Sequence, residues 1–275
     1  MNVILSFINI LLISCGELIY LLGVLIAIGF LLGFLERYSN TFLVQVLGPR
    51  GILVTAWIGT PIHELGHLLM CFIWGHRVTR VKLLQLNSPD GVLGYVAHQY
   101  NPNSFYQQVG NFFIGIGPIF SGIGSLILGM YLLLPQSYAT FITEIRHHVS
   151  FEKLDLTVLK SIGGAAIAIT KSLFTLHNLI NPFFWIFLVL AISISSHIAL
   201  SKADIENSAR GLVMIFFLLV LFNLFTGFIG FDSYEMIIRL GEYNAYVLAF
   251  SSIAVLFSLV IFAFSFTLYK LKNVR

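Results

Sequence analysis

Long apolar segments separated by short polar ones run through the whole chain, which has 275 residues. A helix needs about 20 mostly apolar residues to cross the hydrocarbon core of a bilayer. The pattern predicts about six transmembrane helices, at about 16–35, 51–74, 109–134, 182–197, 212–229 and 246–268. It therefore predicts an all-α polytopic membrane protein in which residues 1–275 form a single integral membrane domain.

The first apolar run is longer than one span needs, because it extends from residue 3 to residue 35. Ser14-Cys15-Gly16-Glu17 interrupts it with a capping-box pattern, in which a serine precedes a helix and an acidic residue follows three positions later. We expect a short membrane-lying helix before this point and the first transmembrane helix after it.

Between the second and third predicted spans, the pattern changes to that of a small β-hairpin, at about 80–98. Residues 81–86 and 92–96 read as short strands around a Pro89-Asp90-Gly91 turn. The edge of such a hairpin can pair with an extended substrate segment by adding a strand. A simple connecting hairpin accounts for the pattern equally well.

Two further regions bear on packing. The span at 109–134 is rich in glycine, including Gly110, Gly115, Gly117 and Gly122, which favours close packing against the helix at 51–74. From about 135 to 180, charged residues alternate with apolar ones at helical spacing. This region predicts amphipathic helices that lie on the membrane surface or pack over the bundle.

Composition agrees with a membrane protein and excludes a soluble domain, because 58% of residues are hydrophobic and only 10% are charged. The net charge of +3 is small and dispersed, so no nucleic-acid partner is expected. The two cysteines lie in apolar surroundings and indicate no disulfide framework. The lipid bilayer is the first partner that the sequence predicts.

The distribution of charge predicts an orientation in the membrane. Six spans place both termini on one side, together with the basic residues near 77–82 and in the tail at 270–275. The opposite loop, near 232–242, is net acidic. Because basic loops stay in the cytoplasm, we expect cytoplasmic N- and C-termini.

Ionisable side chains occur inside the second predicted span, in His63-Glu64-Leu65-Gly66-His67. His63 and His67 are four residues apart and share one face of a helix, where two imidazoles can bind one zinc ion (Zn2+). Glu64 lies beside them and can take a proton from metal-bound water. Such groups are costly in lipid and are seldom found there without a function. The alternative is a histidine pair packed within a helix bundle.

A catalytic zinc needs three protein ligands and one open position. A third histidine six residues beyond His67 is excluded, because that position is Ile73. A glutamate some twenty to forty residues further on is also excluded, because the next one after Glu64 is Glu144. The third ligand must come from elsewhere in the chain.

His197 and Asp204 are the best candidates for this third ligand. His197 ends the fourth predicted span on the same side as His67, and Asp204 follows it by seven residues. One of them can bind zinc while the other orients a ligand. Asp204 also matches a capping box that begins at Ser201. Asp90 is a weaker candidate, because the turn explains it without a metal. His76 and His98 are expected at the surface or in the hairpin.

The chain resembles the site-2 protease family of intramembrane zinc metalloproteases. The resemblance lies in His63–His67 within a span, the β region that follows it, and Asn111-Phe-Phe-Ile-Gly-Ile-Gly-Pro118 at the next span. It covers roughly residues 55–125, with a looser match near 195–211. In this family the third ligand is usually an aspartate in an Asp-Gly motif on a later span. Here the comparable Asp90-Gly91 lies in the early hairpin instead.

The resemblance implies zinc held by His63 and His67, Glu64 as the general base, and cleavage of a membrane protein substrate within a transmembrane segment toward the cytoplasmic side. Two other functions fit the sequence. One is a non-catalytic membrane protein, either a transporter or an assembly factor, that uses the histidines for metal passage or structure. The other is a membrane hydrolase that acts on a lipid or a prenylated substrate.

Overall fold

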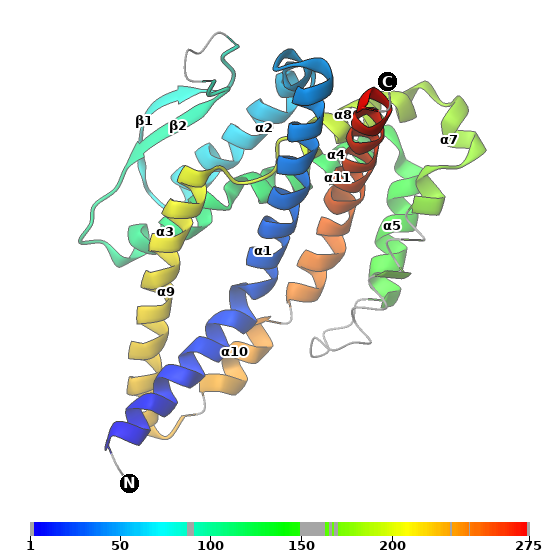
Figure 1. Cartoon of the computed structure of the whole chain (residues 1–275). Coiled ribbons are helices and arrows are strands. Elements are labelled where there is room, and N and C mark those ends of the chain that lie inside the picture. Colours follow the sequence, from blue (N-terminus) through cyan, green and yellow to red (C-terminus); the bar gives the residue numbers. More distant parts are fainter. Residues whose placement is uncertain are drawn as a thin grey trace.

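The chain folds into an assembly of long helices with a small β-hairpin at one end (Figure 1). A computed structural model describes residues 3–86, 91–148, 163–164, 167, 170–231, 233–241 and 243–273. Over these residues, the predicted all-α architecture with one small hairpin is confirmed.

The first helix, α1 (Val3–Leu47), is continuous, so the predicted break near residue 16 is wrong. Ser14 and Glu17 are fully buried, and both accept hydrogen bonds from the side-chain amide of Asn223 in α9 (Lys202–Ile229), at 2.9 and 2.6 Å. The two polar side chains therefore pair with a neighbouring helix instead of capping a new one. The helix ends before Gly48, whose φ of 74° lies in the left-handed region that glycine adopts without strain.

The helix that carries the histidine motif, α2 (Arg50–Ile73), packs closely against α4 (Gly117–Leu133). At their crossing the backbones touch, because a Cβ atom on Gly66 would lie 2.5 Å from the carbonyl oxygen of Gly117. The predicted close approach through small residues is confirmed. Helix α3 (Phe105–Gly115) precedes α4 and is bent from it by 53° at Ile116.

Three described helices are long and apolar enough to cross a membrane, namely α1, α9 and α11 (Tyr243–Asn273), and the bent pair α3–α4 makes a fourth if it counts as one span. The fifth apolar helix, α8 (Pro182–Ser195), has only 14 residues. The prediction of a membrane protein is confirmed at this level, and the count of six spans is not. Cytoplasmic termini stay a prediction, because the helices alone define no sidedness.

Strands β1 (Arg77–Lys82) and β2 (Tyr95–Gln99) form an antiparallel pair, which confirms a hairpin in this region. The strand bounds predicted at 81–86 and 92–96 are wrong, because the pairing lies further from the turn. Arg77 pairs with Gln99 and Lys82 with Tyr95, with an irregularity between residues 78 and 80. Asp90, the weaker ligand candidate of the turn, lies outside the described residues. The hairpin packs against α2, which brings its returning segment close to the histidine motif.

Part of the region at 135–180 is described as α5 (Pro135–His148) and α7 (Leu176–Ile180). Helix α5 is amphipathic as predicted, because it buries Phe141 and Ile145 and exposes Thr140 and Arg146. Most of residues 149–169 lie outside the description. A short helix, α10 (Ser233–Gly241), connects α9 to α11 at the end of the molecule opposite the hairpin (Figure 1).

Candidate metal centre

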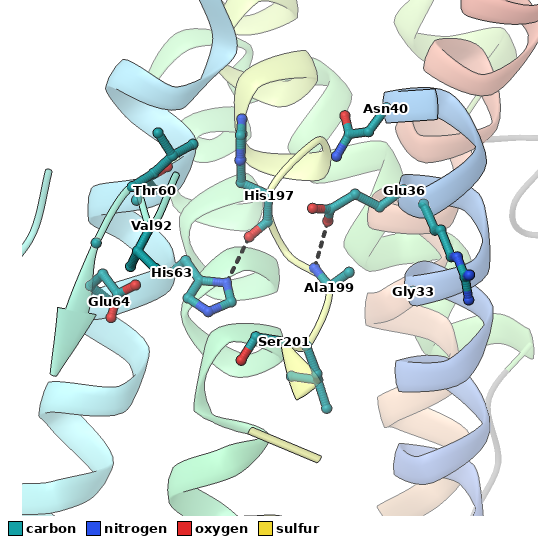
Figure 2. Close-up of a pocket in the computed structure, with 14 residues that line it drawn as sticks. Gly33, Glu36, Asn40, Thr60, His63, Glu64, Val92, His197, Ala199 and Ser201 are labelled. Atoms are coloured by element: carbon teal, nitrogen blue, oxygen red, sulfur yellow. Dashed lines mark hydrogen bonds between the residues drawn. The ribbon is translucent and has the colours of Figure 1, made fainter. Parts of the chain in front are cut away.

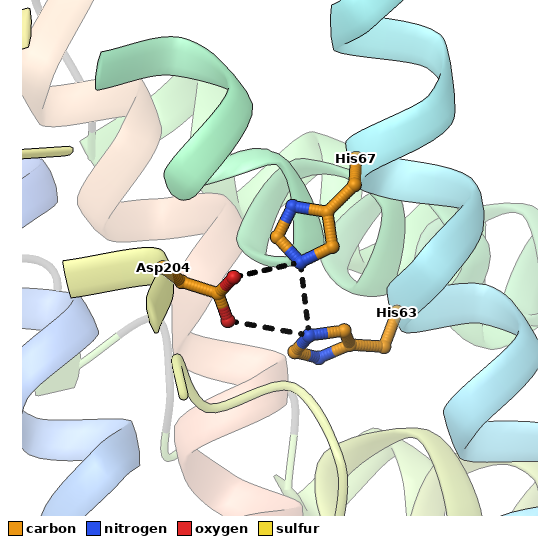
Figure 3. Close-up of side chains that lie close together, drawn as sticks. All are labelled: His63, His67 and Asp204. Atoms are coloured by element: carbon orange, nitrogen blue, oxygen red, sulfur yellow. Dashed lines mark hydrogen bonds and ion pairs between the residues drawn. The ribbon is translucent and has the colours of Figure 1, made fainter. Parts of the chain in front are cut away.

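Three side chains from two helices converge where the start of α9 faces α2 (Figure 3). The Nε2 atoms of His63 and His67 are 3.1 Å apart. Asp204 places one carboxylate oxygen 3.2 Å from His67 Nε2 and the other 3.6 Å from His63 Nε2. The structure thus brings together His63, His67 and one of the two candidates for the third ligand, Asp204.

The three side chains lie close enough to share one metal ion. Zinc binds nitrogen and oxygen ligands at about 2.0–2.1 Å, so two ligand atoms on one edge of the tetrahedron lie about 3.3–3.4 Å apart. The two nitrogens, 3.1 Å apart, lie close to that value. The contacts of 3.2 and 3.6 Å involve different oxygens of Asp204, and one ligand atom from each of the three side chains gives a set within 4.8 Å. This buried group could hold a metal ion.

Two backbone carbonyls orient the imidazoles. The Nδ1–H of His63 donates to the carbonyl oxygen of His197 at 2.8 Å, and the Nδ1–H of His67 donates to that of Ile114 at 2.7 Å. A carbonyl oxygen only accepts, so in each neutral ring the proton is on Nδ1 and the lone pair is on Nε2. Both lone pairs face the same point, beside a carboxylate. Fixing the tautomer in this way is typical of metal-binding histidines.

The position of Asp204 depends on the cap of α9. Ser201 caps this helix, accepting the N–H of Asp204 at 3.2 Å, and its own N–H donates to Asp204 Oδ2 at 2.8 Å. The capping box and the ligand role were alternatives in the sequence, and the structure shows that the capping residue also lies beside both histidines. A carboxylate is also favoured at this end of a helix by the helix dipole.

His197 lies next to the group, but its imidazole is not part of it. The ring points away from His63, and its Nε2 lies 3.0 Å from the hydroxyl oxygen of Thr55 (Figure 2). Its contribution to the site is the backbone carbonyl that His63 contacts. Gly59 makes this packing possible, because a Cβ atom there would lie 2.6 Å from the His197 ring.

Glu64 is buried, with 6% of its surface exposed, and lines a cavity of about 380 Å³ together with His63 (Figure 2). The segment returning from the hairpin covers this side chain closely, since a Cβ atom on Gly94 would lie 2.7 Å from Glu64 Cγ. The opposite wall of the cavity is formed by α1 and by the linker between α8 and α9. A carboxylate therefore adjoins the candidate ligands within a space that another molecule can enter.

The contacts that the backbone near residue 115 makes with the site were not predicted from the sequence. The carbonyl of Ile114 binds His67, and the next residue, Gly115, lies against the start of α9. A Cβ atom on Gly115 would lie 2.5 Å from the carbonyl oxygen of Asp204. The signal in the sequence was the Gly-Ile-Gly segment at 115–117, where the chain bends between α3 and α4.

Neither family models, nor curated proteins, nor solved structures give a match to this chain. Its fold and site define an integral membrane protein with a buried group of two histidines and an aspartate. What it does must therefore be argued from that group.

Proposed function

We propose that this protein is an intramembrane zinc metalloprotease, which hydrolyses a peptide bond in or near a transmembrane segment of a membrane protein substrate. One observation carries the proposal. His63, His67 and Asp204 converge to within 4.8 Å of one another, and Glu64 lines the adjoining cavity. The resemblance of residues 55–125 to the site-2 protease family implies the same activity.

The set of ligands favours a catalytic zinc. Two imidazoles and one carboxylate leave one tetrahedral position open, as in catalytic zinc sites, whereas structural sites use four protein ligands. When bound, zinc would lower the pKa of a coordinated water toward about 7 and polarise the carbonyl of the scissile peptide bond.

The chain itself supplies binding and proton transfer. Asp204 provides the negative charge that offsets the dication, and the carbonyls of His197 and Ile114 hold the two rings in place. The Glu64 carboxylate accepts a proton from the attacking water as the new C–O bond forms. It then gives that proton to the amine nitrogen as the C–N bond breaks.

The cavity sets the form of the substrate. Its volume of about 380 Å³ is at the lower end of the usual size of ligand pockets, so it admits a few residues in an extended form rather than a whole helix. A substrate helix must therefore unwind locally to expose its peptide bond. The site is proposed to face the cytoplasm, as the charge distribution predicts.

Replacing Glu64 with glutamine tests the catalytic role. We expect Glu64→Gln to retain one zinc per chain and to lose cleavage of a transmembrane substrate in proteoliposomes by at least about a hundredfold, the lower range for a lost general base. Metal content is measured by elemental analysis of the same preparation. Cleavage at the wild-type rate would refute Glu64 as the base. Metal-dependent transport that survives the substitution would favour a transporter.

A second set of variants tests the ligands. We expect His63→Ala and Asp204→Ala to lose zinc, because each removes one of three donor atoms. His197→Ala should retain zinc, because the variant keeps the backbone carbonyl that contacts His63. Zinc bound to Asp204→Ala and absent from His197→Ala would reverse the assignment of the third ligand.

A further inference from the structure

Glu36 of α1 lies across the cavity from His63 and contacts the linker between α8 and α9 (Figure 2). Its Oε2 accepts the backbone N–H of Ala199 at 2.9 Å. Helix α1 contributes no ligand to the group of His63, His67 and Asp204. Glu36 is nevertheless a carboxyl group on an apolar helix, where such a group is costly and rarely lacks a role.

The linker that Glu36 contacts carries two of the interactions that shape the metal centre. Two residues before Ala199, the carbonyl of His197 accepts the Nδ1–H of His63. Two residues after it, Ser201 caps α9 and binds the Asp204 carboxylate through its N–H. Ala199 is therefore the midpoint of a five-residue segment that orients one histidine ligand at one end and the aspartate at the other.

We propose that Glu36 is a positioning residue for the metal centre. By accepting the Ala199 N–H, it fixes the linker and thereby sets both the ring of His63 and the carboxylate of Asp204. The inference rests on the proposed zinc site but not on proteolysis. If Glu36 served only as a polar group in the cavity wall, its removal would leave the affinity for metal unchanged.

Zinc affinity of the purified full-length protein, measured by competition with a chelator, tests this role. We expect Glu36→Leu to weaken zinc binding by about tenfold or more, as loss of residues that support metal ligands commonly does. Glu36→Gln should keep most of the affinity, because its amide oxygen still accepts the Ala199 N–H. The matched control is Glu206→Leu, which removes an exposed carboxylate from α9 that pairs with Lys202.

The outcomes separate this inference from the proposed function. Equal zinc affinity in the wild type and in Glu36→Leu overturns the positioning role while leaving the zinc site intact. A similar loss in Glu206→Leu overturns it too, because the effect would then reflect charge alone. A wild-type protein that binds no zinc overturns the proposed function, and this inference with it.

A measurement on the wild type covers the case in which the Glu36 variants fail to fold. Coupling between two sites is reciprocal, so if the contact between Glu36 and Ala199 strengthens zinc binding, zinc must strengthen that contact. We expect hydrogen exchange of the Ala199 amide to slow about tenfold when zinc is added, matching the affinity effect. Identical exchange with and without zinc overturns the proposal.

Discussion

The carbonyl oxygens of Ile114 and His197 determine how the two histidines present their nitrogens. Each acceptor fixes a proton on Nδ1, so both Nε2 lone pairs face Asp204 without any rearrangement. The two carbonyls come from segments far apart in the chain. The ligand geometry therefore depends on backbone placement as much as on the side chains of the motif.

Gly115→Ala tests this dependence at one residue. The added Cβ would lie 2.5 Å from the Asp204 carbonyl oxygen and 2.0 Å from the Ser208 hydroxyl oxygen, so the start of α9 must shift. We expect a loss of stability of about 1–3 kcal/mol, as for overpacking in general, together with weaker zinc binding. Thermal unfolding and chelator competition measure the two effects.

The control for this substitution is Gly124→Ala in α4. Nothing lies within 4 Å of a Cβ atom at that position. It should be neutral or slightly stabilising, because alanine is the better helix former. If both variants behave alike, the close contact at Gly115 has no energetic consequence.

The sequence reveals side-chain chemistry much better than backbone contacts. The spacing of His63 and His67 is a local property of one helix, so it could be predicted directly. Asp204 could be proposed as one of two candidates, but only the folded chain shows that its side chain, and not that of His197, lies with His63 and His67. The orienting carbonyls could not be predicted, because every residue carries one.

The hairpin is joined to α3 through two histidines at its base, His76, which is buried, and His98, which is half-buried. His76, expected at the surface or in the hairpin, directly precedes β1 and is only 5% exposed, so it lies at the base of the hairpin and not at the surface. Its Nε2–H donates to the carbonyl of Gln107 at 2.8 Å, and its Nδ1 lies 3.0 Å from His98 Nδ1. The neutral ring of His76 therefore accepts the Nδ1–H of His98. Burial lowers the pKa of both histidines, and the pKa of His98 falls to about 4.

This pair predicts how the hairpin responds to acid. The pKa of His98 in the folded protein lies below the unfolded value of about 6.5, so the unfolded chain binds more protons as the pH falls. Stability is thus retained above about pH 6.5 and declines as the pH falls from there toward 4. We expect faster hydrogen exchange across β2 at pH 5 than at pH 7, after correction for intrinsic rates.

The variant His98→Gln isolates the contribution of this ring. It removes the titrating group, so the difference in corrected exchange between pH 7 and pH 5 should shrink. An equal pH effect in the variant and the wild type would assign the response to another group.

Helix α1 forms two separate sets of polar contacts with α9 and the linker before it, one near each end of α9. In one set, Glu36 of α1 binds the linker that leads into α9. In the other, Ser14 and Glu17 of α1 bind Asn223 of α9, whose Oδ1 accepts the hydroxyl of Ser233 from α10. Asn223 follows Asp204 by 19 residues, or about 28 Å along a helix. The two sets of contacts are thus separated by roughly the thickness of a hydrocarbon core.

Hydropathy alone could not predict how many helices cross the membrane. Helices α2 and α8 both pack against α4, yet each also exposes large apolar side chains, such as Trp57 and Val189. The 14 residues of α8 span about 21 Å, which is short of a full crossing. Helix length, together with hydropathy, therefore separates α8 from long spans such as α9.

The hydrogen bonds of Asn223 should stabilise the fold without affecting the candidate metal centre. Asn223→Leu removes the donor to Ser14 and Glu17 and the acceptor of Ser233, and leaves buried polar groups with fewer partners. We expect a loss of about 1–3 kcal/mol in the free energy of unfolding. Zinc content should not change, because sites this far apart contribute independently.

Thermal unfolding in detergent and elemental analysis of the same sample measure both quantities for Asn223→Leu. Phe225→Leu is the matched control, because Phe225 lies on the same helix and is 63% exposed. A zinc loss in Asn223→Leu with unchanged stability would show that α9 transmits strain between the two sets of contacts. An unchanged melting temperature would show that the hydrogen bonds of Asn223 add little to the packing of α1 against α9.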